Sequence, residues 1–298
     1  MSVDVVVTAT PFMDLTFIGL EALPKTGEER FAGDLWRSPG GGAINAIGAA
    51  RLGLRTALAA PLGQDLEGDF IREELAHEGI ALLTSSAART PTTVVMPHGG
   101  ERAMVTYEPG ITARAADVAA FEPRAVIVSI NQLDIVPDGV PAYTTCGDDD
   151  ARAFARRPPP DLHRARVLFV NRREARQLTG HDSAEDGAAR LGECVPIAVV
   201  TCGAEGAVAA VDGELLRAPA FPTEVVDTTG AGDLLCAAFV WADLAGADPQ
   251  AALSWAVLYG SLSVSVPTGA GGAVTRDRLI EEASRRGLPP LQAKERTE

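Results

Sequence analysis

Cysteine is scarce in this sequence and follows no metal-binding or disulfide pattern. The four cysteines, Cys146, Cys194, Cys202 and Cys236, are widely spaced, form no CxxC pair and have no histidine nearby at zinc spacing. We therefore expect neither a disulfide framework nor a structural metal site. Ordinary small core residues explain the four thiols more simply.

Long hydrophobic runs are also missing. No apolar stretch reaches the ~20 residues that a membrane-spanning helix requires. The segment from Met1 to Thr10 is a short β-branched run without the basic residues that open a secretory signal, and it reads as a first strand. We expect a protein without membrane association, located in the cytoplasm.

Basic residues are in the minority. Forty acidic residues stand against 26 basic ones, which gives a formal net charge of -14 and a pI near 4.8. This balance argues against broad electrostatic binding to nucleic acid or to an anionic membrane. An anionic substrate would need a local group of amides, basic side chains or a metal ion. The 46% of hydrophobic residues still suffice for a substantial core.

Two common nucleotide-binding motifs are absent. No Gly-Lys-Ser/Thr follows the glycines of the chain at P-loop spacing. No G-x-G-x-x-G opens a helix after the first strand, where a Rossmann-type dehydrogenase needs it. Neither class of nucleotide-binding protein is therefore indicated.

The most informative stretch is 227–233, which reads Asp-Thr-Thr-Gly-Ala-Gly-Asp. Gly230, Ala231 and Gly232 allow a turn to expose its backbone N–H groups at the positive end of an apolar helix expected over 234–244. Asp233 would lie in the first turn, where a carboxylate can accept a proton from a hydroxyl that attacks phosphorus. Phosphoryl transfer is the first hypothesis; an ordinary turn with a helix-capping Asp is the alternative.

The remaining segments predict an α/β protein. We expect strands at 3–8, 56–61, 125–130, 142–145, 167–170 and 197–201, a hairpin at 207–211 and 214–218, and helices at 67–78, 152–157, 251–266 and 279–286. Two regions, 17–38 and 92–107, hold short β-rich runs without helices, which we interpret as a small lid over the substrate site. Residues 131–141 are too short and proline-broken for a crossover helix, and the polar tail from Gln292 should fray.

Several polar residues stand where ligands usually bind. Asp14 follows the first strand, the position at which open α/β sheets place ligands. Asn45 follows a run of three glycines into an Ala-rich helix and offers both a donor and an acceptor, although tight helix packing explains the glycines equally well. Asn171 and Glu174, at a strand-to-helix transition, could orient Mg²⁺ or form a capping box.

In this order the motifs resemble the ribokinase-like (PfkB) carbohydrate kinase family over nearly the whole chain. One family signature resembles the stretch 40–53, and the second, more specific one resembles 227–246. The resemblance implies a three-layer α/β/α sandwich with a mostly parallel central sheet and a small β-sheet lid. It implies a single kinase domain over 1–298, with lid strands from about 15–38 and 90–109.

The resemblance also implies a role for each motif. Asp233 matches the catalytic base, and Gly230, Ala231 and Gly232 match the anion hole. The acceptor-binding positions are matched by Asp14, Gly41, Gly42 and Asn45. Asn171 and Glu174 match a motif that organises Mg²⁺ through water, Thr201, Gly203, Gly206 and Gly269 match nucleotide-binding turns, and Asp227 and Thr229 match a loop that often binds K⁺.

The implied reaction is ATP-dependent phosphorylation of a primary hydroxyl on a small ribose- or fructose-like sugar, in a homodimer formed through the lid. A nucleoside kinase, with Tyr107 or Phe17 stacked on the base, and a non-catalytic sugar or nucleotide sensor are the alternatives. Gln132, at the end of the 125–130 strand, is a further acceptor candidate. Arg89, Arg102 or Arg114 could bind a phosphorylated acceptor, although each is more simply a surface charge.

Overall fold

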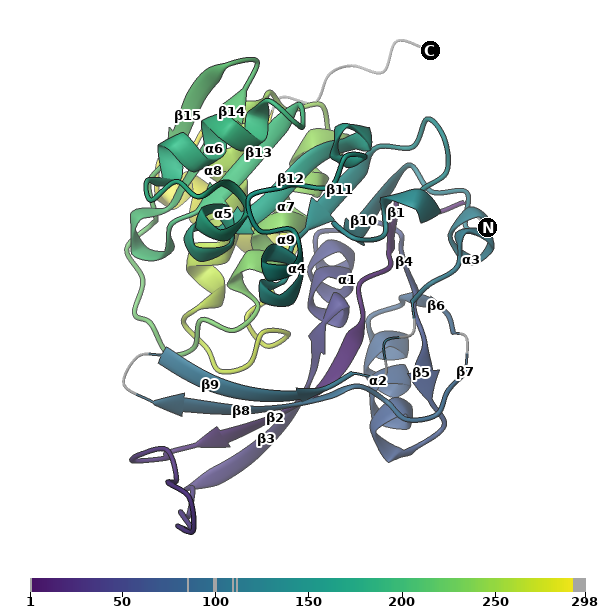
Figure 1. Ribbon diagram of the computed structural model, residues 1–298, viewed down its shortest axis with the longest axis vertical. Helices are drawn as coiled ribbons and strands as arrows, with labels where there is room; N and C mark the ends of the chain where they lie inside the picture. Colours follow the sequence, from purple (N-terminus) through teal and green to yellow (C-terminus); the bar gives the residue numbers. More distant parts are fainter. Residues whose placement is uncertain (1, 85, 99–100, 109, 111, 292–298) are drawn as a thin grey trace.

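The computed structural model describes residues 2–84, 86–98, 101–108, 110 and 112–291. The tail from Gln292, which we expected to fray, lies outside the described residues, as do residues 99, 100 and 109 of the predicted lid segment. A large sheet with helices on both sides and a smaller separate sheet make up the described part (Figure 1).

The central sheet runs in the order β15-β14-β13-β12-β11-β10-β1-β4-β6. Its strands are β1 (Val5–Val7), β4 (Thr56–Ala59), β6 (Ala81–Leu83), β10 (Ala125–Ser129), β11 (Ala142–Thr145), β12 (Ala165–Asn171), β13 (Ile197–Thr201), β14 (Ala207–Val211) and β15 (Glu214–Ala218). Neighbouring strands from β6 to β13 are parallel, and β14 and β15 add an antiparallel hairpin. Unbroken apolar runs such as Val5–Val7 suit strands that are covered on both faces.

Helices cover both faces of this sheet, so the predicted three-layer α/β/α architecture is confirmed. One face carries α1 (Gly42–Arg51), α2 (Leu66–His77), α7 (Ala231–Leu244), α8 (Pro249–Ser263) and α9 (Arg276–Arg285). The other carries α3 (Ala115–Ala119), α4 (Asp148–Ala153), α5 (Arg172–Thr179) and α6 (Ala184–Gly192). Among the described residues no helix is long and apolar enough to cross a membrane.

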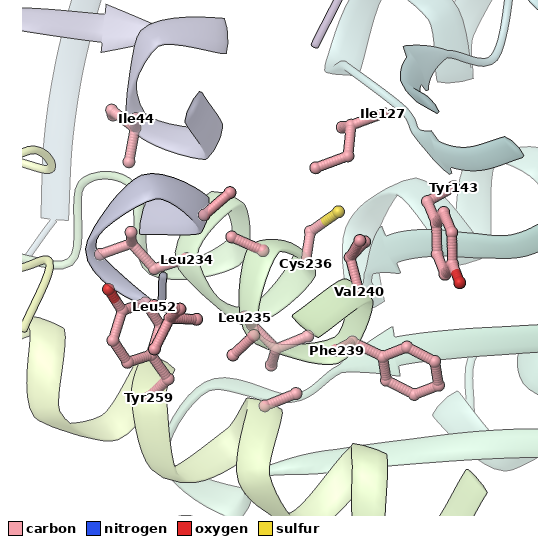
Figure 2. Packing of buried hydrophobic residues seen from close by; sticks show 14 of the residues in the cluster. Ile44, Leu52, Ile127, Tyr143, Leu234, Leu235, Cys236, Phe239, Val240 and Tyr259 are labelled. Atoms are coloured by element: carbon pink, nitrogen blue, oxygen red, sulfur yellow. The ribbon is translucent and has the colours of Figure 1, made fainter. Parts of the chain in front are cut away.

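Helix α7 lies at the centre of the first of these cores. Figure 2 shows Leu234, Leu235 and Phe239 of α7 among side chains from α1 and the central sheet. The axes of α1 and α7 come close because Gly48 lacks a side chain: a Cβ there would lie 2.6 Å from Cδ2 of Leu234. The packing fixes the start of α7 against the start of α1.

The small sheet, here called the lid sheet, contains β2 (Pro11–Ile18), β3 (Asp34–Gly41), β8 (Thr92–His98) and β9 (Glu101–Tyr107) in the order β3-β2-β8-β9. It lies below the central sheet in Figure 1. Its first two strands begin before and end after the predicted range of 15–38. A short ladder of β5 (Leu62–Gly63) and β7 (Ser86–Ala87) completes the strands of the described residues.

Some predicted elements are shifted, and two of the helices were missed. The helix predicted at 152–157 is α4, which begins at Asp148 because three acidic residues favour the first turn of a helix. Helices α3 and α6 were not predicted; Ser183 caps α6 by accepting a hydrogen bond from the Asp186 backbone N–H at 2.9 Å. The crossover from β10 to β11 holds only a 3₁₀ turn, η1 (Leu133–Ile135), as its shortness predicted.

Candidate active site

The starts of α1 and α7 bring two polar side chains together. Asn45 is 1% exposed, and its Nδ2 donates a hydrogen bond of 2.7 Å to Oδ1 of the partly buried Asp233. Desolvation raises the pKa of Asp233 to about 6, while the hydrogen bond from Asn45 and the charge of Arg102 act in the opposite direction. At neutral pH this carboxylate is therefore mostly ionised. The Oδ1 of Asn45 is buried and has no hydrogen-bond partner.

Gly230 precedes α7 and has φ +75°, a left-handed conformation that favours glycine. A Cβ at this position would lie 2.8 Å from Cα of Gly269 and 2.9 Å from Cδ1 of Ile44. Two loops therefore touch at Gly230 and Gly269, and no larger residue fits between them. Gly232, two residues on, is exposed, and a Cβ there would meet no atom within 4 Å. The start of α7 beside Asp233 is thus open.

Asp14 lies within β2 rather than in the loop where the sequence placed it. Cross-strand register aligns it with Ser38 of β3 and Thr93 of β8, and Thr93 with Thr106 of β9. Thr93 and Thr106 are joined through their hydroxyls at 3.2 Å. We call Ser38, Asp14, Thr93 and Thr106 the polar row; apart from Asp14, sequence reasoning missed it.

Three members of the polar row are shielded from solvent, whereas Thr106 is exposed, and the row lies near other charges. Asp14, Ser38 and Thr93 are each 6% exposed. Desolvation and the negative charges of Asp233 and Asp227 raise the pKa of Asp14 to about 7, against the opposing charge of Arg102. The polar row therefore belongs to the inner face of the lid sheet, the face directed toward Asp233.

The three consecutive glycines pack against the protein itself. A Cβ at Gly40 would lie 2.2 Å from Oδ2 of Asp14, and one at Gly42 would lie 2.0 Å from the carbonyl oxygen of Ala9. Gly41 has φ +55° and leaves no room beside Phe12. The structure thus supports the tight-packing explanation for these glycines and places Gly41 and Gly42 at the junction of β3 and α1.

Asp227 ties two loops together. One carboxylate oxygen accepts a hydrogen bond from the Thr229 backbone N–H at 2.8 Å, and the other accepts from that of Thr268 at 3.0 Å. The hydroxyl oxygen of Thr229 is buried without a hydrogen-bond partner. An unpartnered oxygen beside a carboxylate fits the oxygen ligands that hard cations prefer.

Asn171 and Glu174 form the capping box that we considered as their local explanation. Oε2 of Glu174 accepts from the Asn171 backbone N–H at 2.8 Å, and Oδ1 of Asn171 accepts from that of Glu174 at 2.9 Å. Burial raises the pKa of Glu174 to about 7, opposed by the hydrogen bonds from Asn171. In the described part of the chain no group of three or more His, Cys, Asp or Glu residues could hold a metal ion.

Thr201, Gly203 and Gly206 follow one another at the end of β13. Thr201 is its last residue, Gly203 opens the 3₁₀ turn η3 (Gly203–Glu205), and Gly206 has φ +96°. A Cβ at Gly206 would lie 2.0 Å from the Ala218 carbonyl oxygen, so close packing on the end of β15 explains this glycine.

The two aromatic candidates, Phe17 and Tyr107, lie on the other face of the lid sheet from the polar row. Phe17 and Tyr107 are on the outer face of the lid sheet, because Phe17 is three residues from Asp14 and Tyr107 is next to Thr106 along their strands. The expectation that either stacks on a nucleobase in the site is therefore wrong.

Of the three arginine candidates, one contacts the loop beside the candidate site. Arg114 pairs with Asp117 of α3 at 2.8 Å, and Arg89 is exposed. Arg102 alone of the three contacts the 227–233 loop: its guanidinium donates to the Thr228 hydroxyl at 2.8 Å. Gln132 stands before η1 with its Oε1 buried and unpartnered.

Comparison with known proteins decides the family. The model of the pfkB family carbohydrate kinases matches residues 7–275, a range that holds all the site residues described above. The chain belongs to the pfkB family of carbohydrate kinases. This pfkB kinase is therefore a phosphotransferase acting on an acceptor of the sugar or nucleoside type.

Relatives of both acceptor types are similar to the pfkB kinase. The nucleoside kinase of Methanothermobacter thermautotrophicus is 31% identical over 230 residues, which cover 70% of this chain and 72% of that one. The ribokinase of Bacillus subtilis is 27% identical over 297 residues, covering 90% and 95%. The structure of Arabidopsis thaliana ribokinase complexed with ribose and ATP has a TM-score of 0.77 at 25% identity, covering 94% and 98%. The predicted ribokinase-like fold is confirmed.

Proposed function

We propose that this kinase transfers the γ-phosphoryl group of ATP to a primary hydroxyl of a small ribose- or fructose-like sugar, with Asp233 as the base. The observation that carries the proposal is the Asn45–Asp233 contact beside the open, glycine-rich start of α7. A carboxylate that can take a proton stands there next to backbone amides that favour an anion. The Arabidopsis ribokinase complex with ribose and ATP supports both substrates.

The chemistry is an in-line displacement. The acceptor hydroxyl oxygen bonds to the γ-phosphorus, the bond between that phosphorus and the bridging oxygen breaks, and ADP leaves with the electron pair. Asp233 accepts the hydroxyl proton. Backbone N–H groups at Gly230, Ala231 and Gly232 stabilise the charge on the transferred group.

The acceptor is recognised by groups that suit several hydroxyls. The unpartnered Oδ1 of Asn45 can accept a hydrogen bond from one hydroxyl, and the carboxylate of Asp14 can accept from others. Ser38 and Thr93 extend the polar row on either side of Asp14. Because buried polar groups without partners cost free energy, an acceptor with hydroxyls at these points binds better than one without. The backbone of Gly41 and Gly42 would lie next to the bound acceptor.

The nucleotide and its ions would bind at the carboxyl ends of β12 and β13 and the neighbouring loops. Thr201, Gly203, Gly206 and Gly269 would line the nucleotide, and Asn171 and Glu174 would hold Mg²⁺ through water. When bound, Mg²⁺ neutralises phosphate charge. Asp227 and the unpartnered hydroxyl of Thr229 fit a monovalent cation such as K⁺, which would hold the anion-hole loop in place without contacting the acceptor.

A nucleoside acceptor is the second candidate, favoured by the 31% identity to a nucleoside kinase. The sugar moiety of a nucleoside would meet the same polar row. Neither Phe17 nor Tyr107 faces the site, so the aromatic stacking that would favour a base is not supplied by these two residues. This difference favours the free sugar.

We also propose that residues 1–298 act as one kinase domain and that two copies pair through the outer face of the lid sheet. Leu35, Val105 and Tyr107 on this face are 44%, 64% and 49% exposed. An apolar patch of this kind is normally covered by a partner. Light scattering during size-exclusion chromatography should give a dimer for the native chain and a monomer for Val105→Lys; a native monomer would refute the pairing.

ATP consumption tests the proposed activity. Purified protein with Mg²⁺ and K⁺ is assayed with ribose, fructose, fructose 6-phosphate, 2-keto-3-deoxygluconate, myo-inositol, adenosine and cytidine. We expect ADP formation that depends on a sugar and falls about 10²–10⁴-fold in Asp233→Asn, the usual effect of losing a general base. Near-normal turnover in Asp233→Asn would refute the assignment of Asp233 as the base. If none of the acceptors in the panel raises ADP formation above background, the sensor alternative is favoured.

A further inference from the structure

We propose that Arg102, at the edge of the lid sheet, is a catalytic residue whose guanidinium stabilises the negative charge on the phosphoryl group in transfer. This inference rests on the proposed phosphoryl transfer and adds a residue to it. Arg102 lies on β9, far in sequence from the loop that holds Gly230–Gly232. The lid would thereby supply a cation to the reaction as well as a cover.

The contact between the lid and the catalytic loop is direct. The Nη1 of Arg102 donates a hydrogen bond of 2.8 Å to the Thr228 hydroxyl, across 126 residues of sequence. Thr228 stands two residues before Gly230, the first of the three residues proposed as the anion hole. A guanidinium at this point is within reach of an anion bound at the start of α7.

Most N–H donors of the Arg102 guanidinium have no hydrogen-bond partner among the described residues. Arginine carries five N–H donors in a planar fork, and Arg102 directs one hydrogen bond to Thr228. Within the described residues Arg102 makes no ion pair with a carboxylate, although most arginines of this chain do. Its remaining donors suit phosphate oxygens, which a guanidinium binds in a bidentate manner.

The surrounding charges point to the same role. Asp14, Asp227 and Asp233 gather around the acceptor and the loop, and Arg102 is the basic side chain that acts on both Asp14 and Asp233 among the described residues. Three carboxylates oppose the arrival of a polyanion. A single cation placed next to the anion hole offsets that repulsion where the charge develops.

Recognition of an already phosphorylated acceptor fits less well. Such an acceptor would bring its phosphate toward the polar row, where the buried Asp14 would repel it. Arg102 contacts the loop of the transferred group instead. The guanidinium therefore hydrogen-bonds the oxygens of the transferring phosphoryl group, while Asp233 alone takes the proton and ADP leaves as above.

The test compares Arg102→Gln and Arg102→Lys with Arg164→Gln. Arg164 is an exposed arginine of the 3₁₀ turn at Leu162–Arg164, before the amino end of β12 and therefore at the opposite edge of the sheet from the site. We expect kcat to fall about 10²–10³-fold in Arg102→Gln, with a change of under about threefold in the acceptor KM, as for loss of one transition-state donor. Arg102→Lys should recover part of the loss because it keeps the charge but lacks the fork. Arg164→Gln should match the native enzyme.

A second measurement separates this role from a structural one. Calorimetric titration with ADP and aluminium fluoride, in the presence of the acceptor, forms a complex that resembles the transferring group. We expect Arg102→Gln to weaken this complex at least tenfold while ADP alone binds as before. Unchanged kcat, or a loss confined to the KM of a phosphorylated acceptor such as fructose 6-phosphate, would overturn the inference. Failure of the proposed function itself would be recognised by an inactive native enzyme.

Discussion

Asn45 donates a hydrogen bond from Nδ2 to Oδ1 of Asp233 at 2.7 Å, and so joins the first turns of two helices that lie 188 residues apart in the sequence. The neighbours of these two residues, Ile44 and Leu234, are both buried in the core that Figure 2 shows. Core packing therefore holds the hydrogen bond in place. One oxygen of Asp233 is engaged by Asn45, and the other remains for the acceptor hydroxyl.

Loss of this contact should change the pH dependence of the enzyme. In Asn45→Leu the donor that lowers the pKa of Asp233 is gone, so this pKa rises above about 6. We expect the acidic limb of the kcat/KM profile to move up by about one to two pH units, since a hydrogen bond to a charged group is worth roughly 1.5–3 kcal/mol and one pKa unit corresponds to about 1.4 kcal/mol. Asn131→Leu, which removes a hydrogen bond to Asp150 instead, is the control and should leave the limb in place. An unmoved limb in Asn45→Leu would show that the contact does not tune the base.

Asp14 should lower the stability of the fold at alkaline pH. Its pKa is 3.8 in a model peptide and about 7 in the folded chain, so the folded state binds a proton more tightly than the unfolded state between these values. The free energy of unfolding therefore falls as pH rises from about 4 to about 7, by at most about 4 kcal/mol at 1.4 kcal/mol per pKa unit. Asp14→Asn should be more stable than the native chain at pH 8 and similar near pH 4 in urea denaturation.

Asp4 provides a control of opposite sign. Hydrogen bonds from Arg55 and Arg124 hold the pKa of Asp4 well below its usual range. Its contribution to stability is present above the unfolded pKa and is lost at lower pH. Asp4→Asn should therefore destabilise the chain at pH 8, and a matching loss of stability in Asp14→Asn would refute the argument.

Arg51 should act as a support for the nucleotide loop. At the end of α1 it donates to the carbonyl oxygens of Ala270 at 3.2 Å and Ala273 at 2.6 Å, and it pairs with Glu78 at 2.6 Å. Arg51→Met keeps the apolar stem but leaves these acceptors unpaired, at a cost of about 1–3 kcal/mol. We expect a lower Tm and weaker ATP binding by calorimetry.

The matched control for Arg51 is Arg190→Met. Arg190 pairs with Glu193 on an exposed helix surface, where ion pairs contribute about 0–1 kcal/mol. Its Tm and ATP affinity should stay close to those of the native chain. Equal effects of the two substitutions would mean that Arg51 has no special relation to the loop.

Gly230 and Gly232 should respond differently to alanine. Gly230→Ala adds a Cβ 2.8 Å from Cα of Gly269 in a left-handed conformation, so the two loops must separate. We expect a loss of roughly 1–3 kcal/mol in the free energy of unfolding. Gly232→Ala meets no atom within 4 Å and should leave the Tm unchanged, with any loss of activity arising from the ligand. A lower Tm in Gly232→Ala would contradict the described geometry.

The unpartnered hydroxyl of Thr229 should make activity depend on monovalent cations. We expect KCl to stimulate native turnover severalfold over tetramethylammonium chloride at equal ionic strength. Thr229→Val removes the oxygen but keeps the shape, so it should reduce this stimulation while the rate without K⁺ changes little. Thr223→Val, whose hydroxyl donates to the Phe221 carbonyl, is a control on the same segment and should retain the response.

The turn at 227–233 and the start of α7 could be predicted from sequence because they are local features. Residues 227–233 and the hairpin at 207–211 and 214–218 are defined by turns and apolar runs within a few positions, and Asp212 and Gly213 at the hairpin tip have the positive φ that its turn requires. The polar row could not be predicted. The neighbours of Asp14 across the sheet are set by the register of β2 with β3 and β8. The sequence of a single strand does not encode that register.

Helix α6 and the Arg102–Thr228 contact could not be predicted either, because both depend on tertiary packing. Helix α6 contains Gly187 and Gly192 and few large apolar residues, so its pattern is weak until it packs on β13 and β14. The Arg102–Thr228 contact joins segments that no local pattern relates. An arginine on an exposed strand is usually a solvated charge, and only the folded arrangement distinguishes this one.

Strand β3 ends at Gly41 and α1 begins at Gly42, so no linker separates the lid sheet from the helix that carries Asn45. The junction is packed too tightly to absorb a rotation by itself. If the lid sheet moves outward, we expect the first turn of α1 to move with it, which would shift Asn45 relative to Asp233. The geometry around the proposed base would then depend on the position of the lid sheet.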